Sequence, residues 1–360
     1  MAAYLNEIGT AVPHHDVHAS YLQIAPFFLE AESDRKSFAK MARRAGISHR
    51  YSTLKPAAPE EWHKRYDADG FYGPGQFPTT GARMQRFAQD APALVDQALD
   101  NLAARLDPDW NKGVTHLVIC TCTGFAAPGL DHHVITQHGL ATTVERTMIG
   151  FMGCNAAMNG YKTARHIVTS DPSARVLVLN VELCGLHFQE NAPLTTALMF
   201  MLFADGAAAA LISADPKGMA LQSFRSDLLP DSRDKITWDI GDNGFNMWLS
   251  GRVPRTISRT LPGHFETLRQ DAEGRDIELW AIHPGGRTIL DAVEMSLDLD
   301  PSDIAHSRGV LNDFGNMSSA TLPFVLQRML SDPMSERTGV AIGFGPGISV
   351  ESMVFQEARA

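Results

Sequence analysis

Apolar and polar residues occur in blocks whose lengths and spacings predict strands and helices in turn along the chain. Apolar-rich runs of strand length cover residues 4–12, 115–123, 174–183 and 277–285. Apolar residues recur with helical spacing over 34–45, 82–105 and 154–168, and a helix, a turn and a strand are predicted within 196–213. This order indicates an α/β protein built of layered sheets and helices.

The second half of the chain follows the same order. The pattern predicts a helix over 286–297, a strand over 307–311, a helix over 318–331 and strands over 339–345 and 348–356. The composition changes at 215–219, so we expect two domains, 1–215 and 216–360. In each half a predicted strand leads through glycine to a polar residue at a helix start, Cys154 in the first and Asn316 in the second. Two such units would place both side chains at one shared centre.

Composition and charge restrict the classes of function. The chain has 360 residues, 44% of them hydrophobic, and its 31 basic and 41 acidic residues give a net charge of −10. This acidic balance argues against a general nucleic-acid-binding surface, and four cysteines are too few for a disulfide scaffold. No run approaches the ~20 apolar residues of a membrane span, and the first residues lack the features of a secretion signal. We therefore expect a cytoplasmic protein.

Cys154 is the strongest candidate nucleophile. It lies between Gly153 and Asn155, and the following Ala156 and Ala157 let a helix start close to its neighbours. A helix N-terminus stabilises a nearby anion, so we expect the pKa of this thiol to be lowered toward the thiolate form. The alternative is an inert buried cysteine that packs as a small apolar side chain.

Two further residues complete a possible reaction centre. His283 ends an apolar strand in AIHPGG, where Pro284 and two glycines stop the strand, and α/β proteins bind ligands at strand ends. Asn316 in GNMSSAT can donate from its side-chain amide at a helix start, although an ordinary N-cap is the alternative. A thiol, an imidazole and an amide donor together suit acyl transfer and decarboxylation. Cys120 and Cys122 lack the partners of a zinc site, so we expect no bound metal.

Four motifs occur in this order along the chain: GFMGCNAAMNG, AIHPGG, GNMSSAT and GFGPG. Together they resemble the chalcone synthase family, the type III polyketide synthases, and the resemblance runs from the basic helix at 36–44 to the C-terminal GFGPGISVE. It implies the thiolase fold, an αβαβα sandwich of two related α/β halves, and a homodimer. It implies that Cys154 is the acylated nucleophile and that His283 holds it as a thiolate. His283 and Asn316 would then bind the thioester oxygen during decarboxylation of malonyl-CoA.

The same resemblance implies which residues bind substrate. Lys40 and Arg44 fall where members of the family bind CoA phosphates. Phe203 would be the gatekeeper between the CoA tunnel and the cavity. Cys122 and Cys184 stand where chalcone synthases carry threonines and resemble the bacterial branch, which includes naphthalene-forming and alkylpyrone-forming synthases. The full set of residues that would line the substrate pocket is Phe203, Cys122, Cys184, Trp238, Met247, Gly343 and Ser318.

The expected substrate follows from these pocket residues. Trp238 would replace a small glycine and fill space in the cavity. The motifs supply no charged partner for a starter carboxylate, so we expect fatty acyl-CoA starters, malonyl-CoA extension and cyclisation to an alkylpyrone or alkylresorcinol. Three alternatives remain open: a naphthalene-type synthase that uses only malonyl-CoA, a ketoacyl synthase of fatty-acid initiation, and a non-catalytic acyl-binding scaffold. No metal or redox cofactor is expected, since the CoA thioesters are themselves the substrates.

Overall fold

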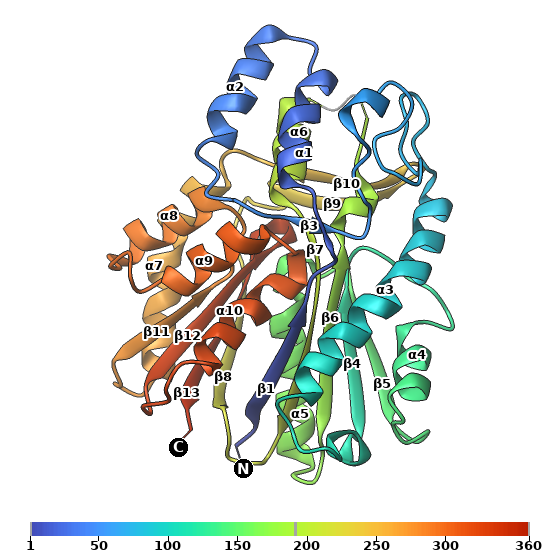
Figure 1. Ribbon diagram of the computed structural model, residues 1–360. Coiled ribbons are helices and arrows are strands. Elements are labelled where there is room, and N and C mark those ends of the chain that lie inside the picture. Colours follow the sequence, from blue (N-terminus) through green and yellow to red (C-terminus); the bar gives the residue numbers. More distant parts are fainter. Residues whose placement is uncertain (1, 191–192, 359–360) are drawn as a thin grey trace.

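A computed structural model describes residues 2–190 and 193–358, and within them nine strands form one mixed sheet (Figure 1). In spatial order the strands are β11 (Ile277–Ile282), β12 (Thr338–Gly345), β13 (Ser349–Glu357), β8 (Met219–Leu228), β1 (Tyr4–Ala11), β7 (Asp205–Ser213), β6 (Val176–Leu183), β4 (His116–Thr121) and β5 (Glu145–Gly150). The sheet is parallel where β4 meets β5 and β6 and where β11 meets β12, and antiparallel elsewhere.

The two halves of the chain meet in this sheet through a short junction. β1 pairs with β8 only at Tyr4–Ala220 and Leu5–Met219, whereas β1 pairs with β7 along its whole length. The strands of the first half therefore lie on one side of the junction, and those of the second half on the other. The predicted α/β class is confirmed. The domain division at residues 215 and 216 stays a prediction, because the two halves share one sheet.

Helices cover the sheet on both outer faces and fill the space between its halves. The outer helices are α3 (Thr80–Ala103) and α4 (Leu130–Gln137) over the first half, and α7 (Val253–Asp271) and α8 (Arg287–Leu297) over the second, with α9 (Ala305–Phe314) beside α8. The central helices are α5 (Ala156–Ser170) and α10 (Thr321–Leu330), each of which contacts strands of both halves. One cluster of buried apolar side chains surrounds the central helices between the two halves of the sheet, and one further cluster lies under the outer helices of each half. The layers are therefore helix, sheet, helix, sheet, helix.

A cap of smaller elements lies over one end of the sheet in Figure 1. It consists of β2 (His15–Asp16), α1 (His18–Ile24), α2 (Glu32–Ala42), β3 (Tyr51–Ser52), α6 (Leu194–Leu202) and the hairpin of β9 (Ile236–Gly241) and β10 (Gly244–Leu249). Short 3-10 turns are Ala25–Phe28, Pro59–Glu61, Trp110–Gly113, Gly153–Asn155, Cys184–His187, Ser318–Ala320 and Pro346–Ile348. In the described part of the chain no helix is both long and apolar enough to cross a membrane.

One predicted strand is wrong. Residues 307–311 lie inside α9, where Ser307, Val310 and Leu311 form the buried face of a helix. A short apolar run cannot by itself separate a buried strand from a buried helix face. A helix therefore leads to Asn316, and the similarity between the halves is limited to a glycine turn followed by a helix. The strand expected before Cys154, for which the pattern gave no bounds, is β5, and the pattern gave no sign of β8, the β9–β10 hairpin, α1, α4 or α7.

Candidate active site

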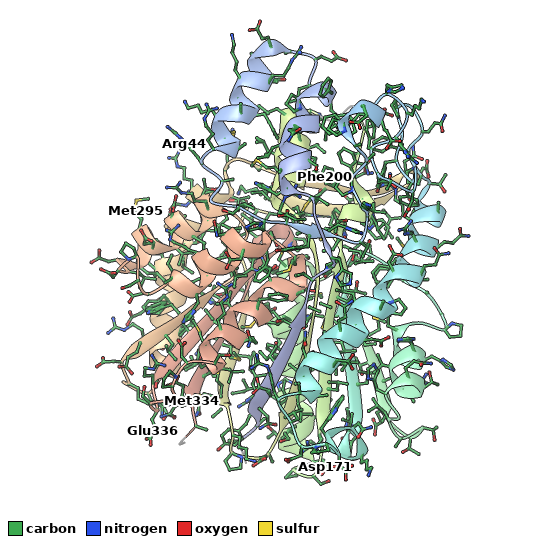
Figure 2. The ribbon with its side chains drawn as sticks, viewed as in Figure 1. Arg44, Asp171, Phe200, Met295, Met334 and Glu336 are labelled. Carbon is green, nitrogen blue, oxygen red and sulfur yellow. The ribbon has the colours of Figure 1, made fainter. Side chains whose placement is uncertain are left out.

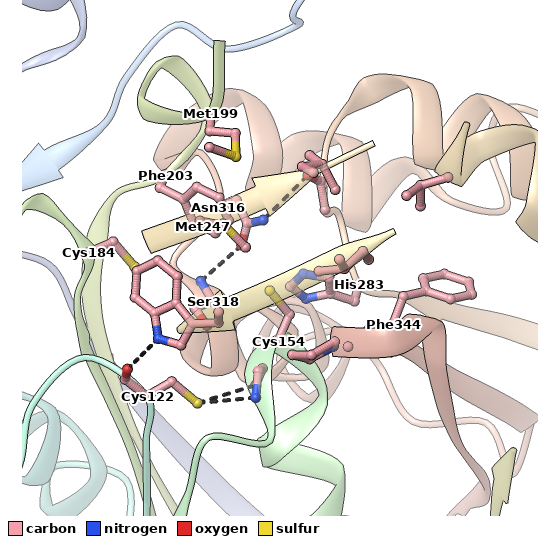
Figure 3. A pocket seen from close by; sticks show the side chains of 18 of the residues that line it. Cys122, Cys154, Cys184, Met199, Phe203, Met247, His283, Asn316, Ser318 and Phe344 are labelled. Carbon is pink, nitrogen blue, oxygen red and sulfur yellow. Dashed lines mark hydrogen bonds between the residues drawn. The ribbon is translucent and has the colours of Figure 1, made fainter. Parts of the chain in front are cut away.

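A cavity under the cap brings the three predicted reactive residues together (Figure 3). It contains about 910 Å³ of empty space, its open part included. Cys154 reaches it from the turn before α5, His283 from the end of β11, and Asn316 from the turn after α9. Three segments far apart in sequence thus supply one side chain each.

The turn that carries Cys154 depends on its glycine. Gly153 has φ +72°, and a Cβ there would lie 2.2 Å from Cδ of Pro346. Only glycine allows the first half of the chain to approach the GFGPG segment this closely. Its N–H also donates to Sγ of Cys122 at 3.1 Å, so the turn is fixed from both sides.

Burial decides the protonation of Cys154 and His283. Burial raises the pKa of Cys154 to about 11, although Ser318 and Asn316 act in the opposite direction. Burial also lowers the pKa of His283 to about 3. At neutral pH the pair is therefore a thiol beside a neutral imidazole. The expectation that the helix start would lower the pKa of Cys154 is wrong, because loss of solvation outweighs the turn's dipoles.

His283 is held by its backbone and has a free ring. The backbone N–H of His283 donates to the carbonyl of Ile342 at 2.8 Å, and this bond continues the β11–β12 ladder by one residue. The side chain is 1% exposed, and neither ring nitrogen has a hydrogen-bond partner among the described residues. Buried polar atoms are nearly always paired, so two unpaired nitrogens facing a cavity indicate a group reserved for a ligand.

The amide of Asn316 is oriented by its oxygen. Oδ1 accepts from the N–H of Ser318 at 2.9 Å and from the hydroxyl of Thr321 at 3.3 Å. Nδ2 has one long contact of 3.4 Å to the carbonyl of Gly285. The N-cap alternative is wrong, because the N-cap positions are Met317 for the Ser318–Ala320 turn and Ala320 for α10. The Asn316 oxygen instead closes a local turn onto Ser318, and this leaves the NH₂ group available to the cavity.

Glu182 was missed by the sequence analysis. This fully buried carboxylate of β6 accepts from the N–H of Cys122 at 3.0 Å and from the hydroxyls of Thr123 at 2.8 Å and Ser319 at 2.5 Å. Burial raises its pKa to about 7. It fixes the cavity wall on the side of Cys122. The signal was present in VLVLNVEL, a strand in which every residue, the glutamate included, is buried.

Trp238 closes one side of the cavity as part of an aromatic cluster. Its indole N–H donates to the carbonyl of Cys122 at 2.8 Å, and its ring meets His187 edge-on at 5.3 Å. His187 in turn stacks on Phe245 at 4.2 Å. The β9–β10 hairpin is therefore attached to the end of β4, and aromatic rings occupy the space at this wall.

Most of the other predicted pocket residues lie where they were expected. Phe203, Cys122, Cys184, Met247 and Ser318 line the cavity with Trp238. Gly343 is not among the lining residues. A Cβ on Gly343 would meet Asn155 at 3.2 Å, so this glycine makes room for the turn before α5, and Gly345 reaches the cavity instead.

The two predicted CoA-binding residues lie outside the cavity. Lys40 and Arg44 are exposed, at the C-terminal end of α2, and Figure 2 shows Arg44 at the periphery of the molecule. The carbonyl of Arg44 accepts from Nη1 of Arg287 at 3.3 Å, and Arg287 is the first residue of α8. The end of α2 is therefore adjacent to the start of α8, two residues before the cavity-lining Ile289.

A second cavity lies behind the first. It contains about 760 Å³ of empty space and shares Cys184, Phe200 and Phe203 with the first cavity. Its other walls are mainly aromatic and aliphatic, among them Tyr21, Ile24, Leu54, Trp62, Tyr66, Tyr72 and Phe188. Arg50, Asp67 and Asp205 also line it, so Cys184, Phe200 and Phe203 separate the reactive centre from a chamber that is mostly apolar but holds three charged side chains.

Two family profiles cover nearly the whole chain. The N-terminal domain of chalcone and stilbene synthases matches residues 2–216, and the C-terminal domain matches residues 220–358. The protein described as alpha-pyrone synthesis polyketide synthase-like Pks18, from Mycobacterium tuberculosis, is 33% identical over 99% of this chain and 92% of its own length.

Solved structures share the fold from end to end. The 1,3,6,8-tetrahydroxynaphthalene synthase of Streptomyces coelicolor A3(2), a bacterial type III polyketide synthase, is 26% identical with a TM-score of 0.85, over 99% of this chain and 100% of that one. PKS-I from the brown alga Ectocarpus siliculosus is 28% identical with a TM-score of 0.86, over 99% and 98% of the two chains. These likenesses confirm the expected thiolase-like fold.

Proposed function

Because this chain belongs to the chalcone and stilbene synthase family of type III polyketide synthases, we propose that it extends a fatty acyl-CoA starter with malonyl-CoA on Cys154. The enzyme is an acyltransferase, and members of the family use CoA thioesters. The observation that carries the proposal is the unpaired imidazole of His283 beside Cys154 and the NH₂ group of Asn316 in one apolar cavity.

The loading step needs a base and a thiol. Cys154 attacks the carbonyl carbon of the starter thioester while its proton passes to a ring nitrogen of His283. The bond between that carbon and the CoA sulfur breaks, and CoA leaves as a thiol with the proton. Burial lowers the pKa of His283, so its ring is neutral at physiological pH, and its two unpaired ring nitrogens leave one available to take this proton.

The extension step needs an oxyanion site. The bond between the malonyl carboxylate and Cα breaks, carbon dioxide leaves, and the electron pair forms an enolate on the thioester. The amide of Asn316 and the ring of His283 would donate to the enolate oxygen. The enolate carbon then attacks the Cys154 thioester, and Cys154 leaves as a thiolate. Decarboxylation supplies the carbon nucleophile, so we propose no metal or redox cofactor.

The cavity walls favour an apolar starter. None of the residues that line the first cavity carries a carboxylate, an ammonium or a guanidinium. A malonyl starter would bury its carboxylate without a partner, whereas an alkyl tail loses nothing on desolvation. The aromatic and aliphatic part of the second cavity offers room for a long tail that passes between Cys184 and Phe203, whereas Arg50, Asp67 and Asp205 make the rest of that wall polar. In this proposal the product is an alkylpyrone or alkylresorcinol, and the name of the Mycobacterium relative supports the pyrone.

The naphthalene-type reaction is the second candidate. It is supported by Cys122 and Cys184 in the cavity and by the likeness to the Streptomyces enzyme. The two candidates are separated by incubation with malonyl-CoA, with and without a medium- or long-chain acyl-CoA, followed by mass spectrometry. We expect products that carry the alkyl tail. An aromatic product made only from malonate, unchanged by the acyl-CoA, would favour the second candidate.

The second cavity gives the same proposal a sharper test. Ser20 on α1 lines this cavity, and its neighbour Ala19 is exposed. Ser20→Phe should shorten the longest acyl-CoA that the enzyme accepts by several carbons, because the ring fills the chamber. Ala19→Phe, the matched control, should leave the chain-length profile unchanged. If both variants accept the same range of acyl-CoA chain lengths, the acyl tail does not enter the second cavity.

CoA binding and location are proposals of the same kind. Lys40 and Arg44, with Arg287 beside them, could bind CoA phosphates at the mouth between α2 and α8. Four free cysteines and the use of CoA thioesters support a cytoplasmic location.

We also propose a homodimer formed through β5. This strand is the last of the sheet, and the residues 145–148 are exposed along it. An open edge strand is a template for pairing with another chain, and a second copy of this protein offers the same edge. Met148, 44% exposed on β5, would be buried by such pairing.

The proposed dimer predicts that a positive charge at position 148 separates the two protomers. Met148→Arg should convert the dimer to a monomer, because two buried guanidinium groups would face each other across the interface. Met295→Arg is the control, since Met295 is 77% exposed on α8. Light scattering after size-exclusion chromatography measures both variants. A Met148→Arg protein that stays dimeric would exclude β5 as the interface.

A further inference from the structure

Arg50 connects two parts of the site without lining the first cavity. Its side chain is 3% exposed, and Nη1 donates to the carbonyls of Phe200 at 2.6 Å and Phe203 at 2.5 Å. These carbonyls belong to the end of α6, where a helix has no partners of its own for its last carbonyl groups. The guanidinium supplies both the missing donors and a positive charge at the negative end of the helix.

The other side of Arg50 packs against the turn that carries Asn316. A Cβ on Gly315 would lie 2.8 Å from Cγ of Arg50, so the arginine rests directly on this glycine. The backbone of Asn316 is tied to the same segment, because its N–H donates to the carbonyl of Leu202 at 2.8 Å and its carbonyl accepts from Ala204 at 2.9 Å. Phe203 and Asn316 form an isolated parallel β-bridge. The side chain of Arg50 therefore contacts both of the segments that this β-bridge joins.

Arg50 is itself held in one orientation. Nε donates to Nδ1 of His18 at 3.0 Å, and the guanidinium carbon lies 5.0 Å from the ring centre of Tyr21. The pKa of His18 is lowered to about 4, chiefly by burial, so at neutral pH this ring nitrogen is free to accept. A planar group held at Nε presents Nη1 to both carbonyls, whereas a lysine ammonium has its three donors on one nitrogen and cannot hold His18 and the two carbonyls in this planar arrangement.

We propose that Arg50 is a positioning residue that sets the gate Phe203 and the oxyanion donor Asn316 relative to each other. This inference rests on the proposed function, since it assigns Arg50 to the roles given there to these two residues. Loss of the Arg50 contacts, called here the arginine clamp, would let the Leu202–Ala204 segment shift. Asn316 would move with this segment, because two backbone hydrogen bonds join them. A misplacement of about 1 Å at a reacting group can cost ~10²-fold in rate.

The chain contains a matched control. Arg83 is also fully buried, donates Nη1 to two carbonyls, those of Leu186 and Phe188, and lies 5.3 Å from the ring of Tyr72. Its contacts do not include the Asn316 turn. Substitution by lysine should destabilise the fold to a similar degree at either position, so a difference in chemistry between the two variants measures positioning.

The test is the decarboxylation of malonyl-CoA by the purified full chain. Arg50→Lys should lower kcat by about 10- to 100-fold and leave KM for malonyl-CoA within about twofold, at a temperature where the variant is folded. Arg83→Lys should keep a kcat close to that of the wild type. Equal kcat values for the two variants would make Arg50 merely structural and overturn the inference, while wild-type decarboxylation would still stand.

Two further outcomes are decisive. If Arg50→Lys does not fold, His18→Leu replaces it, because this change removes the acceptor that fixes Nε. A loss of kcat beyond that of Arg83→Lys supports the inference, and an equal loss overturns it. A wild-type enzyme that does not decarboxylate malonyl-CoA would overturn the proposed function and this inference together.

Discussion

Cys154→Ala should abolish polyketide formation, with a loss of at least about 10⁴-fold in product from malonyl-CoA and an acyl-CoA starter. The three other cysteines cannot replace it. Cys120 and Cys122 are buried in or beside β4, and burial raises their pKa values. Cys122 and Cys184 line the cavity, but burial raises their pKa values well above the ordinary value, whereas at Cys154 hydrogen bonds from Ser318 and Asn316 partly offset burial. Mass spectrometry of the reaction products measures the effect.

A second substitution at the same position separates the two half-reactions. Cys154→Gln removes the thiol but leaves the ring of His283 and the NH₂ group of Asn316 in place, so release of carbon dioxide from malonyl-CoA should persist. His283→Ala in this background should reduce that release by about 10²- to 10³-fold, since one donor to the enolate oxygen is lost. Normal product from Cys154→Ala would refute the assignment of the nucleophile.

The second large effect concerns the pH dependence of Cys154 alkylation. In the wild type, neutral His283 accepts the thiol proton as iodoacetamide reacts. Its pKa of about 3 makes that base available throughout the range from pH 5 to pH 9, so the rate should be nearly flat there. In His283→Ala the thiolate must form alone against burial, and with a pKa of about 11 its rate should climb steadily above pH 8.

The size of the difference follows from the thiolate fraction. At pH 8 a thiol with a pKa of about 11 is ionised in about one molecule in a thousand, against about a quarter for an ordinary cysteine. We expect His283→Ala to lower the alkylation rate at pH 7 by about 10²- to 10⁴-fold, the usual contribution of a general base. His306→Ala is the control, because His306 pairs with Asp332 away from the cavity. A flat profile in His283→Ala would mean that another group accepts the proton.

The elements that the sequence predicted well are those whose signals are local. The strand 174–183 and the helix 82–105 carry long, strongly patterned runs, and both occur as β6 and α3. The reactive residues were found for a related reason. Gly153 precedes Cys154, and Gly285 and Gly286 follow close after His283, because a backbone must turn sharply to present a side chain in this way. The glycines that a sharp turn requires lie within a few residues of the reactive side chain, so they can be recognised in the sequence.

The remaining features depend on contacts between distant segments. The direction of the pKa shift of Cys154 reverses the expectation from its helix start, since the residues that line its cavity come from distant segments in both halves of the chain. Residues 307–311 form a helix because α8 and α10 pack on it, which no local pattern records. Glu182 could be seen in its strand, but its role follows only from Thr123 and Ser319 meeting it in space.

The sequence by itself therefore predicted the proposed nucleophile, its two companions and the α/β order, because local residue types and spacing encode them. The tertiary structure alone decided the charge of the reactive pair, the second chamber behind Phe203, and the arginine clamp between α6 and the Asn316 turn. The first depends on desolvation, the second on how distant segments pack, and the third on hydrogen bonds between residues more than a hundred positions apart. These contributions arise only once the segments are packed together.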